Sequence, residues 1–250
     1  MPPKTLPSGA KLIAYDRIDS TSAEAKRLAA GGEAGPAWVV AASQDAGYGR
    51  RGRAWASAMG DLAATWFGPA PTSPGLLSFS AALAVAEALA PYVEEGGVRF
   101  KWPNDVLLDG AKAVGILLEL FDGPTGRILS VGVGVNIVSR PALDYPTARV
   151  LDRLRRGVAP PQPLELLKSL DDAFARQRSL LEEEGFAPIK AAWLEHAIGL
   201  HGPIVVRLPT TTLEGTFQGL ADDGALLLQG PDGDVKPIPA GDVYFEEKQQ

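Results

Sequence analysis

A short stretch in the middle of the chain gathers side chains that can bind an anionic ligand. The pair Asn104-Asp105 follows a Trp-Pro turn, and Lys112 stands seven residues after Asp105, just before the apolar run Gly115–Glu119. A turn beside a buried strand supports polar groups rigidly, and a lysine held there is able to neutralise charge developing on a carboxylate or phosphate oxygen. The Asn-Asp pair would then contact a nucleotide and help to hold a magnesium-bound triphosphate. The plainer alternative is ordinary turn chemistry beside a surface lysine.

A second segment, Gly47–Arg53, is rich in groups that bind anions. It places three glycines and three arginines within seven residues. Glycine leaves backbone N–H groups approachable, and arginine offers a fork of donors that matches a carboxylate or a phosphate. Such a loop is able to fold over an anionic ligand and exclude water from it. A solvated basic turn is the alternative, whereas a Walker-type loop is excluded because its Gly-Lys-Ser/Thr ending is absent.

The third segment, Val131–Asn136, alternates valine with glycine and ends in an amide. If it is a strand, Gly132, Gly134 and Asn136 share one face and the valines share the other. A face without side chains lets a flat ligand lie close against the backbone. A bulge or tight internal packing would also account for the glycines, so this segment is informative only together with the other two.

The composition narrows the class of protein. The chain has 250 residues, 46% of them hydrophobic, which is enough for a sizeable core. Its formal net charge of −6 argues against a general nucleic-acid binder. With no cysteine and two histidines, disulfides and thiol nucleophiles are excluded and a structural zinc site is disfavoured. No signal peptide or apolar span is evident, so we expect a cytoplasmic protein.

Hydrophobic periodicity predicts a mixed α+β domain over residues 10–199. Thr21 is the expected N-cap of a helix, with Glu24 reaching back as in a capping box and Gly31-Gly32 ending it. Turns are expected at Asp109-Gly110 and Asp122-Gly123. The expected strands are 12–15, 37–42, 62–67, 106–108, 114–120 and 128–137, and the further expected helices are 76–89, 163–184 and 189–197.

The end of the chain has a different character. Four short apolar runs, 204–208, 213–219, 225–229 and 235–238, are punctuated by two Asp-Gly turns, Asp223-Gly224 and Asp232-Gly233. Short strands with regular turn signals predict a small β-barrel-like module. We expect it to span residues 200–247, with the boundary near Gly199–Gly202.

Taken together and in this order, the segments resemble the biotin protein ligases (biotin–acetyl-CoA-carboxylase ligases). The Lys-Trp-Pro-Asn-Asp motif with its downstream lysine is highly specific, whereas the glycine strand alone is weak. The resemblance implies a mixed-sheet catalytic domain followed by a small SH3-like β-barrel. The matching motifs, within a resemblance that runs from about Leu12 to Phe245, are Asp19–Ser22, Gln44, Gly47–Trp55, Lys101–Asp105, Lys112, Gly115–Glu119 and Gly132–Asn136.

This resemblance implies a two-step reaction. The carboxylate of biotin attacks the α-phosphate of ATP, with Mg²⁺, to give biotinyl-AMP and pyrophosphate. A lysine of a biotin carboxyl carrier domain, part of a carboxylase, then attacks the mixed anhydride. The segment before Leu12 is too short for the DNA-binding helix-turn-helix of some relatives, so we expect no repressor activity and no nucleic-acid partner. We expect no membrane partner, and a homodimer is left open because many relatives pair through sheet edges.

The resemblance also implies roles for individual residues. Lys112 would stabilise charge in both steps, and Arg50 and Arg53 would close on carboxylate and phosphate. The implied biotin-binding residues are Ser20, Thr21, Gln44, Gly47, Arg50, Lys112, Gly115, Gly132 and Gly134. The implied nucleotide-binding residues are Arg50, Arg53, Trp55, Asn104, Asp105, Ile116 and Asn136, and Asp105 is also the candidate metal ligand.

The chain departs from the family pattern in three places, one of them near Ala148-Arg149-Val150, where a small hydroxyl-bearing segment is usual. Tyr48 stands where the family usually has an arginine, and Asp61 replaces a usual asparagine. Tyr48 keeps open one alternative, a catalytically weak paralogue that senses biotin or a nucleotide, and a ligase for lipoate or another acyl group is a second, because such ligases share the fold. Cysteine-dependent octanoyl transferases are excluded, and the Arg-Arg-x-Ser-Gly-Gly-Gly signature of lipoate ligases is absent. A nucleic-acid-binding module, suggested by the loop arginines, is disfavoured by the acidic net charge.

Overall fold

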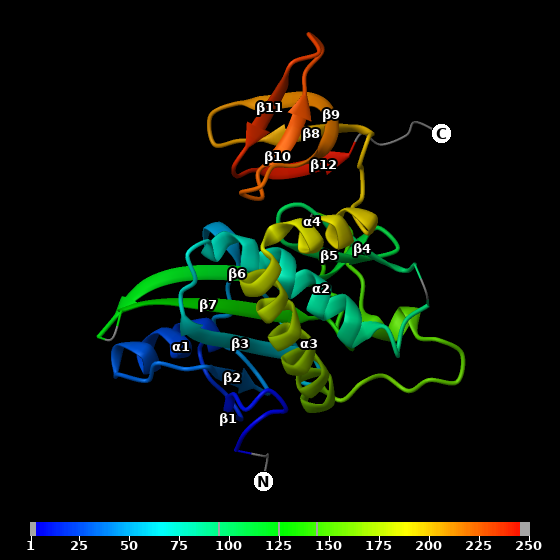
Figure 1. Cartoon of the computed structure of the whole chain (residues 1–250). Coiled ribbons are helices and arrows are strands. Elements are labelled where there is room, and N and C mark those ends of the chain that lie inside the picture. Colours follow the sequence, from blue (N-terminus) through cyan, green and yellow to red (C-terminus); the bar gives the residue numbers. More distant parts are fainter. Residues whose placement is uncertain (1–3, 95, 125, 144, 246–250) are drawn as a thin grey trace.

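The computed structural model, which describes residues 4–94, 96–124, 126–143 and 145–245, contains two β-sheets (Figure 1). The larger sheet is mixed, because β1 and β2 are parallel and the other neighbouring pairs are antiparallel. Its order is β1-β2-β3-β7-β6-β5-β4. The strands are β1 Lys11–Tyr15, β2 Ala37–Ala41, β3 Leu62–Pro69, β4 Val98–Lys101, β5 Asp105–Leu108, β6 Ala111–Gly123 and β7 Gly126–Val135. The predicted α+β class with a mixed sheet is confirmed.

Helices cover the two faces of this sheet unequally. The helices α2 (Leu77–Leu89) and α3 (Pro163–Glu184) pack on one face, and α4 (Phe186–Glu195) packs on α2 and α3. α2 is apolar on nearly every side, which suits a buried helix. On the opposite face α1 (Thr21–Ala30) contacts β2, β3, β6 and β7. Within the described residues no helix is both long and apolar enough to cross a membrane.

The predicted cap of α1 is wrong by one residue. Ser20 is the N-cap, because its hydroxyl accepts from the N–H of Ala23 at 3.4 Å. The Glu24 carboxylate does not reach back but accepts from the Tyr15 hydroxyl at 2.6 Å, and this hydrogen bond, with burial, raises the pKa of Tyr15 to about 12. The shift leaves the side chain of Thr21 free for another partner.

Other element boundaries also differ from the prediction, including those of β6 and α4. β6 continues through Gly123, and Asp122 pairs with Arg127, so these residues belong to the hairpin strands and not to its turn. α4 begins at Phe186, directly after Gly185, whose φ of 77° ends α3 as predicted. The ring of Phe186 packs on Phe79 with centroids 5.1 Å apart, and this contact draws the first turn of α4 onto α2.

The smaller sheet is entirely antiparallel, in the order β11-β10-β9-β8-β12. Its strands are β8 Pro203–Arg207, β9 Thr212–Leu220, β10 Leu226–Gln229, β11 Val235–Ile238 and β12 Asp242–Phe245. Four are predicted from the sequence; β12 is not, although β10 and β11 are equally short. The module is expected to end at residue 247. Residues 246 and 247 lie outside the described part of the chain.

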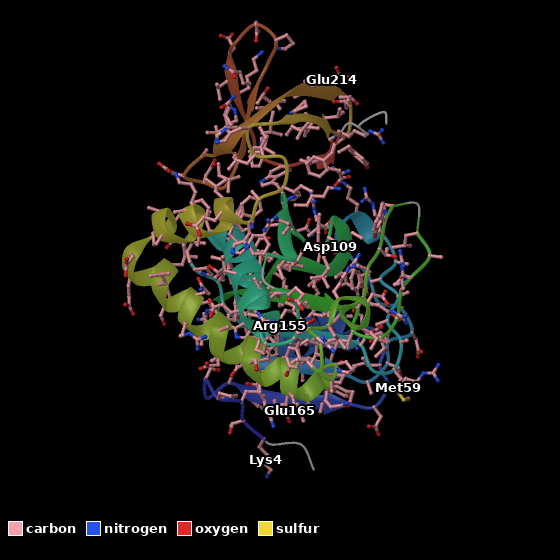
Figure 2. The ribbon with its side chains drawn as sticks, turned by 90° about the vertical axis from the view of Figure 1, so that its right-hand side faces the viewer. Lys4, Met59, Asp109, Arg155, Glu165 and Glu214 are labelled. Carbon is pink, nitrogen blue, oxygen red and sulfur yellow. The ribbon has the colours of Figure 1, made fainter. Side chains whose placement is uncertain are left out.

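The smaller sheet is joined to the rest by packing as well as by the chain. The indole N–H of Trp102 donates to the carbonyl of Gly224 at 3.1 Å, and one hydrophobic cluster contains buried residues of both sheets. Gly224, with φ of 83°, lies so close to Phe79 that a Cβ would come within 2.7 Å of its ring. Figure 2 shows Glu214 in this module and Glu165 at the start of α3, towards opposite ends of the molecule.

Asp61 fixes the chain where it leaves β7. Its side chain is buried, with 3% of the residue exposed, and Oδ1 accepts from the backbone N–H groups of Ile137, Val138 and Ser139 at 2.8, 2.9 and 3.0 Å. Oδ2 accepts from the N–H of Ala58 at 2.9 Å and from the Ser139 hydroxyl. Every one of these partners is a donor, so an acceptor-only carboxylate satisfies them all. The departure from asparagine is thus accommodated by a structural role.

We predict that Asp61→Ala lowers the free energy of unfolding by about 3 kcal/mol, because several buried N–H groups lose their acceptor. Asp61→Asn keeps one acceptor oxygen and should cost about 1 kcal/mol. Urea unfolding of both variants measures the difference. Equal losses would show that the carboxylate does not hold this turn.

Candidate functional site

A row of paired residues crosses the larger sheet from edge to centre. Lys101 pairs with Asp105, Asp105 with Gly115, Gly115 with Gly134, and Gly134 with Ala63. Directly opposed residues of antiparallel strands point to the same face. Two charged side chains therefore stand beside a floor made of two glycines and an alanine. In a neighbouring row, Gly132 lies between Thr65 and Leu117.

This floor opens into a cavity of about 440 Å³ on the face that α1 covers in part. Its walls come from both ends of the sequence, because Asp242, Tyr244 and Phe245 of β12 line it together with the glycine-arginine loop. The residues predicted as site residues that line it are Ser20, Thr21, Gln44, Arg50, Arg53, Trp55, Asn104, Asp105, Lys112, Gly115, Ile116, Gly132 and Gly134.

Two of the predicted site residues lie outside the lining. Gly47 lies behind it, where a Cβ would come within 2.8 Å of the Gln44 amide nitrogen. Asn136 is 2% exposed and its amide donates to the carbonyl of Ala148 at 3.1 Å. Gly47 thus permits the approach of a lining residue, and Asn136 ties β7 to the following loop; their ligand roles stay predictions.

One end of the cavity is a network of hydroxyl and amide groups. The Gln44 amide oxygen accepts from the backbone N–H and the hydroxyl of Thr21, at 2.8 and 3.1 Å. The Thr65 hydroxyl donates to the Thr21 hydroxyl at 2.9 Å and lies 3.2 Å from that of Ser22. These groups are suited to a ligand with several hydrogen-bonding atoms. Thr65 is missing from the sequence prediction, because nothing in its strand distinguishes it from a core threonine.

A β-bulge turns Lys112 into the cavity. Residues three apart on a regular strand point to opposite faces, so Lys112 and Gly115 would normally diverge. Between them the register shifts: Val106 pairs with Val114 but Leu107 with Lys112, which leaves Ala113 as an extra residue. Such a bulge re-aims a side chain. The Lys112 ammonium consequently pairs with Asp105 Oδ1 at 2.6 Å and lies 5.7 Å from the Trp55 ring centroid.

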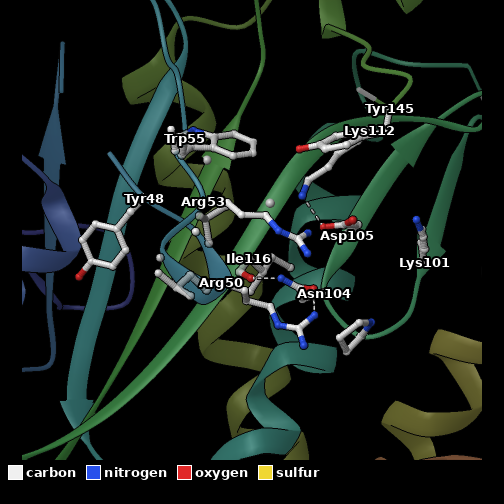
Figure 3. Close-up of a pocket in the computed structure, with 18 of the residues that line it drawn as sticks. Tyr48, Arg50, Arg53, Trp55, Lys101, Asn104, Asp105, Lys112, Ile116 and Tyr145 are labelled. Carbon is white, nitrogen blue, oxygen red and sulfur yellow. Dashed lines mark hydrogen bonds and ion pairs between the residues drawn. The ribbon is translucent and has the colours of Figure 1, made fainter. Parts of the chain in front are cut away.

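The glycine-arginine segment is a small hairpin that closes over the cavity. Trp55 N–H donates to the Gly47 carbonyl at 2.9 Å and Gly49 N–H to the Arg53 carbonyl at 2.8 Å. Its tip needs a left-handed backbone at Gly52, where φ is 71°. Figure 3 shows Arg50 and Arg53 pointing from this hairpin towards Asn104 and Asp105.

The cations in the cavity are partly shielded from water. Burial lowers the pKa of Arg50 and of Lys101 from their usual ranges, and the carboxylates of Asp242 and Asp105 oppose this effect. Arg50 also contacts the Asn104 amide oxygen at 3.2 Å, and the Asn104 amide donates to the Ile116 carbonyl. A concentration of shielded positive charge favours an anionic ligand.

The indole of Trp55 lies on the glycine floor. A Cβ on Gly134 would come within 2.3 Å of this ring, and one on Gly115 within 2.8 Å. The indole N–H is buried without a hydrogen-bond partner in the described structure. The ring therefore forms a wall of the cavity beside Gly115 and Gly134. The floor at Gly132 instead faces the network of hydroxyl and amide groups.

Tyr48, the residue that replaces a usual arginine, anchors the base of the hairpin. Its hydroxyl donates to Glu119 Oε2 on β6 at 2.9 Å, and it points away from Arg50 and Arg53 (Figure 3). Burial and this hydrogen bond raise the pKa of Tyr48 to about 12, so the phenol keeps its proton at neutral pH. Tyr48 therefore attaches the hairpin to the sheet, where the usual arginine would supply a positive charge.

Comparison with known proteins agrees with this geometry. Residues 14–136 match the biotin/lipoate A/B protein ligase family, and residues 203–246 match the biotin protein ligase C-terminal domain. Over 241 residues the chain is 43% identical to a biotin–(acetyl-CoA-carboxylase) ligase of Paracoccus denitrificans, covering 92% of this chain and 98% of the relative. The chain belongs to the biotin protein ligase family.

Other members of the biotin protein ligase family are similar along most of the chain. The bifunctional ligase/repressor BirA of Bacillus subtilis is 34% identical, with 96% of this chain and 75% of that protein covered. Among solved structures, a biotin protein ligase of Aquifex aeolicus in complex with biotin and ATP superposes with a TM-score of 0.77 at 25% identity, covering 93% and 97% of the two chains.

We predict that Gly134→Ala displaces the Trp55 indole and loosens the hairpin, because the new methyl group overlaps the ring. Trypsin cleavage at the hairpin arginines should then become about fivefold faster, as expected when the opening equilibrium shifts by about 1 kcal/mol. Gly75→Ala is the matched control, because a Cβ there meets nothing within 4 Å. Equal cleavage rates for both variants would contradict the packing of Trp55 on this glycine.

Proposed function

We propose that this protein is an ATP-dependent biotin ligase that forms biotinyl-AMP and transfers biotin to a lysine of a biotin carboxyl carrier domain. The observation that carries the proposal is the cavity itself. A floor of glycine and alanine joins a hydrogen-bonding end, at Thr21 and Gln44, to a cationic end, at Arg50 and Lys112. Biotin has the same order of parts: a flat ring system with a polar ureido group, an apolar chain and a carboxylate.

The polar end is suited to the ring system of biotin. A ureido group offers two N–H donors and one carbonyl acceptor, and the network of Ser20, Thr21 and Gln44 contains both kinds of partner. Gly115, Gly132 and Gly134 let the rings and chain lie against the backbone. In the described structure the indole of Trp55 lies against Gly115 and Gly134. It would therefore pack on the apolar chain of biotin and form the border with the nucleotide-binding side.

The cationic end is suited to charge that develops during adenylation. As the biotin carboxylate attacks the α-phosphate, Lys112 stabilises the negative charge on the phosphate oxygens, and pyrophosphate leaves. Asp105 holds the ammonium in place at 2.6 Å before the substrates arrive. In the second step the carrier lysine attacks the carbonyl carbon of the mixed anhydride, AMP leaves, and Lys112 again neutralises the oxygen charge.

The nucleotide side is assigned to Asn104, Asp105, Ile116 and Asn136, with Arg50 and Arg53 on the phosphates. Mg²⁺ is proposed to enter with the triphosphate. The described residues contain no group of three or more metal-binding side chains, and the cavity carboxylates of Asp105 and Asp242 are both paired with cations. Mg²⁺ commonly binds through substrate phosphates, water and one or two carboxylates, so Asp105 is at most one ligand.

The remaining assignments follow from the same proposal. The carrier is the biotin carboxyl carrier domain of a carboxylase, and the reaction takes place in the cytoplasm. Residues 10–199 form the catalytic domain and residues 200–247 an SH3-like module that completes the cavity wall. Nucleic acid is not a partner, and pairing of two copies through sheet edges is left to measurement.

A lipoate ligase is the second candidate, because the matched family includes enzymes for both acids. The network at Thr21, Gln44 and Thr65 favours biotin. A dithiolane ring has no N–H or carbonyl group and would form no hydrogen bond with this network, which is a strong basis for discrimination.

The proposal is tested by incubating the protein with ATP, Mg²⁺, an unmodified biotin carboxyl carrier domain and either biotin or lipoate. We expect the carrier mass to increase by one biotin when ATP is present, and not to increase with lipoate. A lipoyl-sized increase would favour the second candidate. If biotin binds in calorimetry but no transfer occurs, the protein is a biotin sensor.

We predict that Lys112→Ala lowers the rate of carrier labelling by about 10²-fold or more, the loss typical of removing one charge-stabilising group. Circular dichroism should show an unchanged fold. Lys190→Ala is the control, because Lys190 pairs with the exposed Asp222 at 2.7 Å and lies outside the cavity lining. Full activity of Lys112→Ala would rule out the assigned role.

A further inference from the structure

One carboxylate of the smaller sheet contacts all three arginines of the hairpin. Asp242 Oδ2 lies 2.6 Å from Arg53 and 2.9 Å from Arg51, and its Oδ1 lies 3.5 Å from Arg50. Arg50 also donates to the carbonyl of Gly241 at 3.3 Å. The tip of the hairpin is thereby tied to β12, which is about 190 residues away in sequence.

We propose that Asp242 is a positioning residue that keeps the arginine hairpin closed while biotinyl-AMP is held. This inference rests on the proposed ligase activity. Asp242 is not a member of the site predicted from the sequence, and it acts through the arginines and not on the reacting atoms.

The arginines need such a partner because like charges gather at the tip. Three guanidinium groups repel one another, and Arg50 is also partly shielded from water. The Asp242 side chain is only 17% exposed. Burial alone would raise its pKa, but the Arg53 hydrogen bond and the arginine charges outweigh burial and hold the pKa below its usual range. The carboxylate is therefore a fixed negative charge at neutral pH.

The geometry separates holding the hairpin from contacting the ligand. Arg50 and Arg53 line the cavity, whereas Arg51 pairs with Asp242 and is not among the described lining residues. Arg51 has φ of 56°, so its backbone turns the side chain away from its neighbours towards β12. The Arg51–Asp242 pair is thus a latch, and a substitution of Arg51 removes it without changing the lining of the cavity.

The latch matters most at one stage of the reaction. Bound ATP brings several negative charges, which suffice to hold Arg50 and Arg53. After pyrophosphate leaves, the adenylate keeps one charged phosphate. Without Asp242, this single negative charge would have to balance the positive charges of three arginines. We therefore expect Asp242 to slow release of the adenylate and to affect the KM for ATP little.

The walls next to the latch support the same closed arrangement. The Lys101 ammonium lies 5.3 Å from the ring centroid of Tyr244 and 5.9 Å from that of Phe245, the last two residues of β12. β12 consequently contributes a charged contact to the hairpin and an aromatic wall to the cavity. Opening the hairpin requires the charged contact to break while the aromatic wall stays in place.

The experiment measures release of labelled biotinyl-AMP, formed on the enzyme without carrier, together with the KM for ATP. For Asp242→Asn we expect release about tenfold faster and the KM changed less than about threefold, as for loss of one partly buried negative charge. Asp242→Glu should restore slow release. Arg51→Gln should speed release, and the double variant should be no faster than Asp242→Asn alone. Asp222→Asn, an exposed aspartate of the same module, is the control.

Unchanged release in Asp242→Asn, a parallel rise in KM, or additive effects of the two substitutions would overturn the proposal. If the unsubstituted protein forms no adenylate, the ligase assignment fails instead. The latch is then still tested by trypsin without ligand. Faster cleavage after Arg50 and Arg53, the sites that all variants share, in both Arg51→Gln and Asp242→Asn supports it, and cleavage at these sites equal to that of Asp222→Asn contradicts it.

Discussion

The site depends on a strip of the sheet that has no side chains. Gly134 and Gly115 are directly paired on β7 and β6, with Ala63 beside them on β3. On every other part of a packed sheet such a strip would weaken the strands, because glycine contributes no packing contact. Here the opposite face of the same strands carries buried valines, which hold the strands in the core. The sheet is therefore stabilised from one side and open to a ligand on the other.

The charged groups are arranged around this strip by the register of the strands. Asp105 is in the same row as the glycines, and Lys112 reaches that face only because Ala113 forms a bulge. The hairpin arginines approach from above and the Asp242 carboxylate from the second sheet. Segments from most of the length of the chain meet at one place, and each is fixed by a separate element. Positive charge exceeds negative charge in the cavity, which suits a carboxylate and a triphosphate.

The sequence alone predicts much of this arrangement, but not the parts that depend on register. Gly132 and Gly134 are expected on one face from simple alternation, and the order of motifs indicates the family. The bulge at Ala113 has no sequence signal, so the direction of Lys112 is not predictable from strand periodicity. β12 is not among the strands expected from the sequence, and Asp242 is missed with it. The cap of α1 is misassigned because Ser20 and Thr21 are adjacent and both are favourable N-cap residues by type.

The central claim is that the cavity activates the carboxylate of biotin with ATP. It is tested most directly by exchange of labelled pyrophosphate into ATP without any carrier domain, because exchange requires reversible formation of the adenylate on the enzyme. We expect exchange that depends on biotin and is absent with lipoate. Exchange that proceeds without biotin, or no exchange at saturating biotin and ATP, would contradict the account.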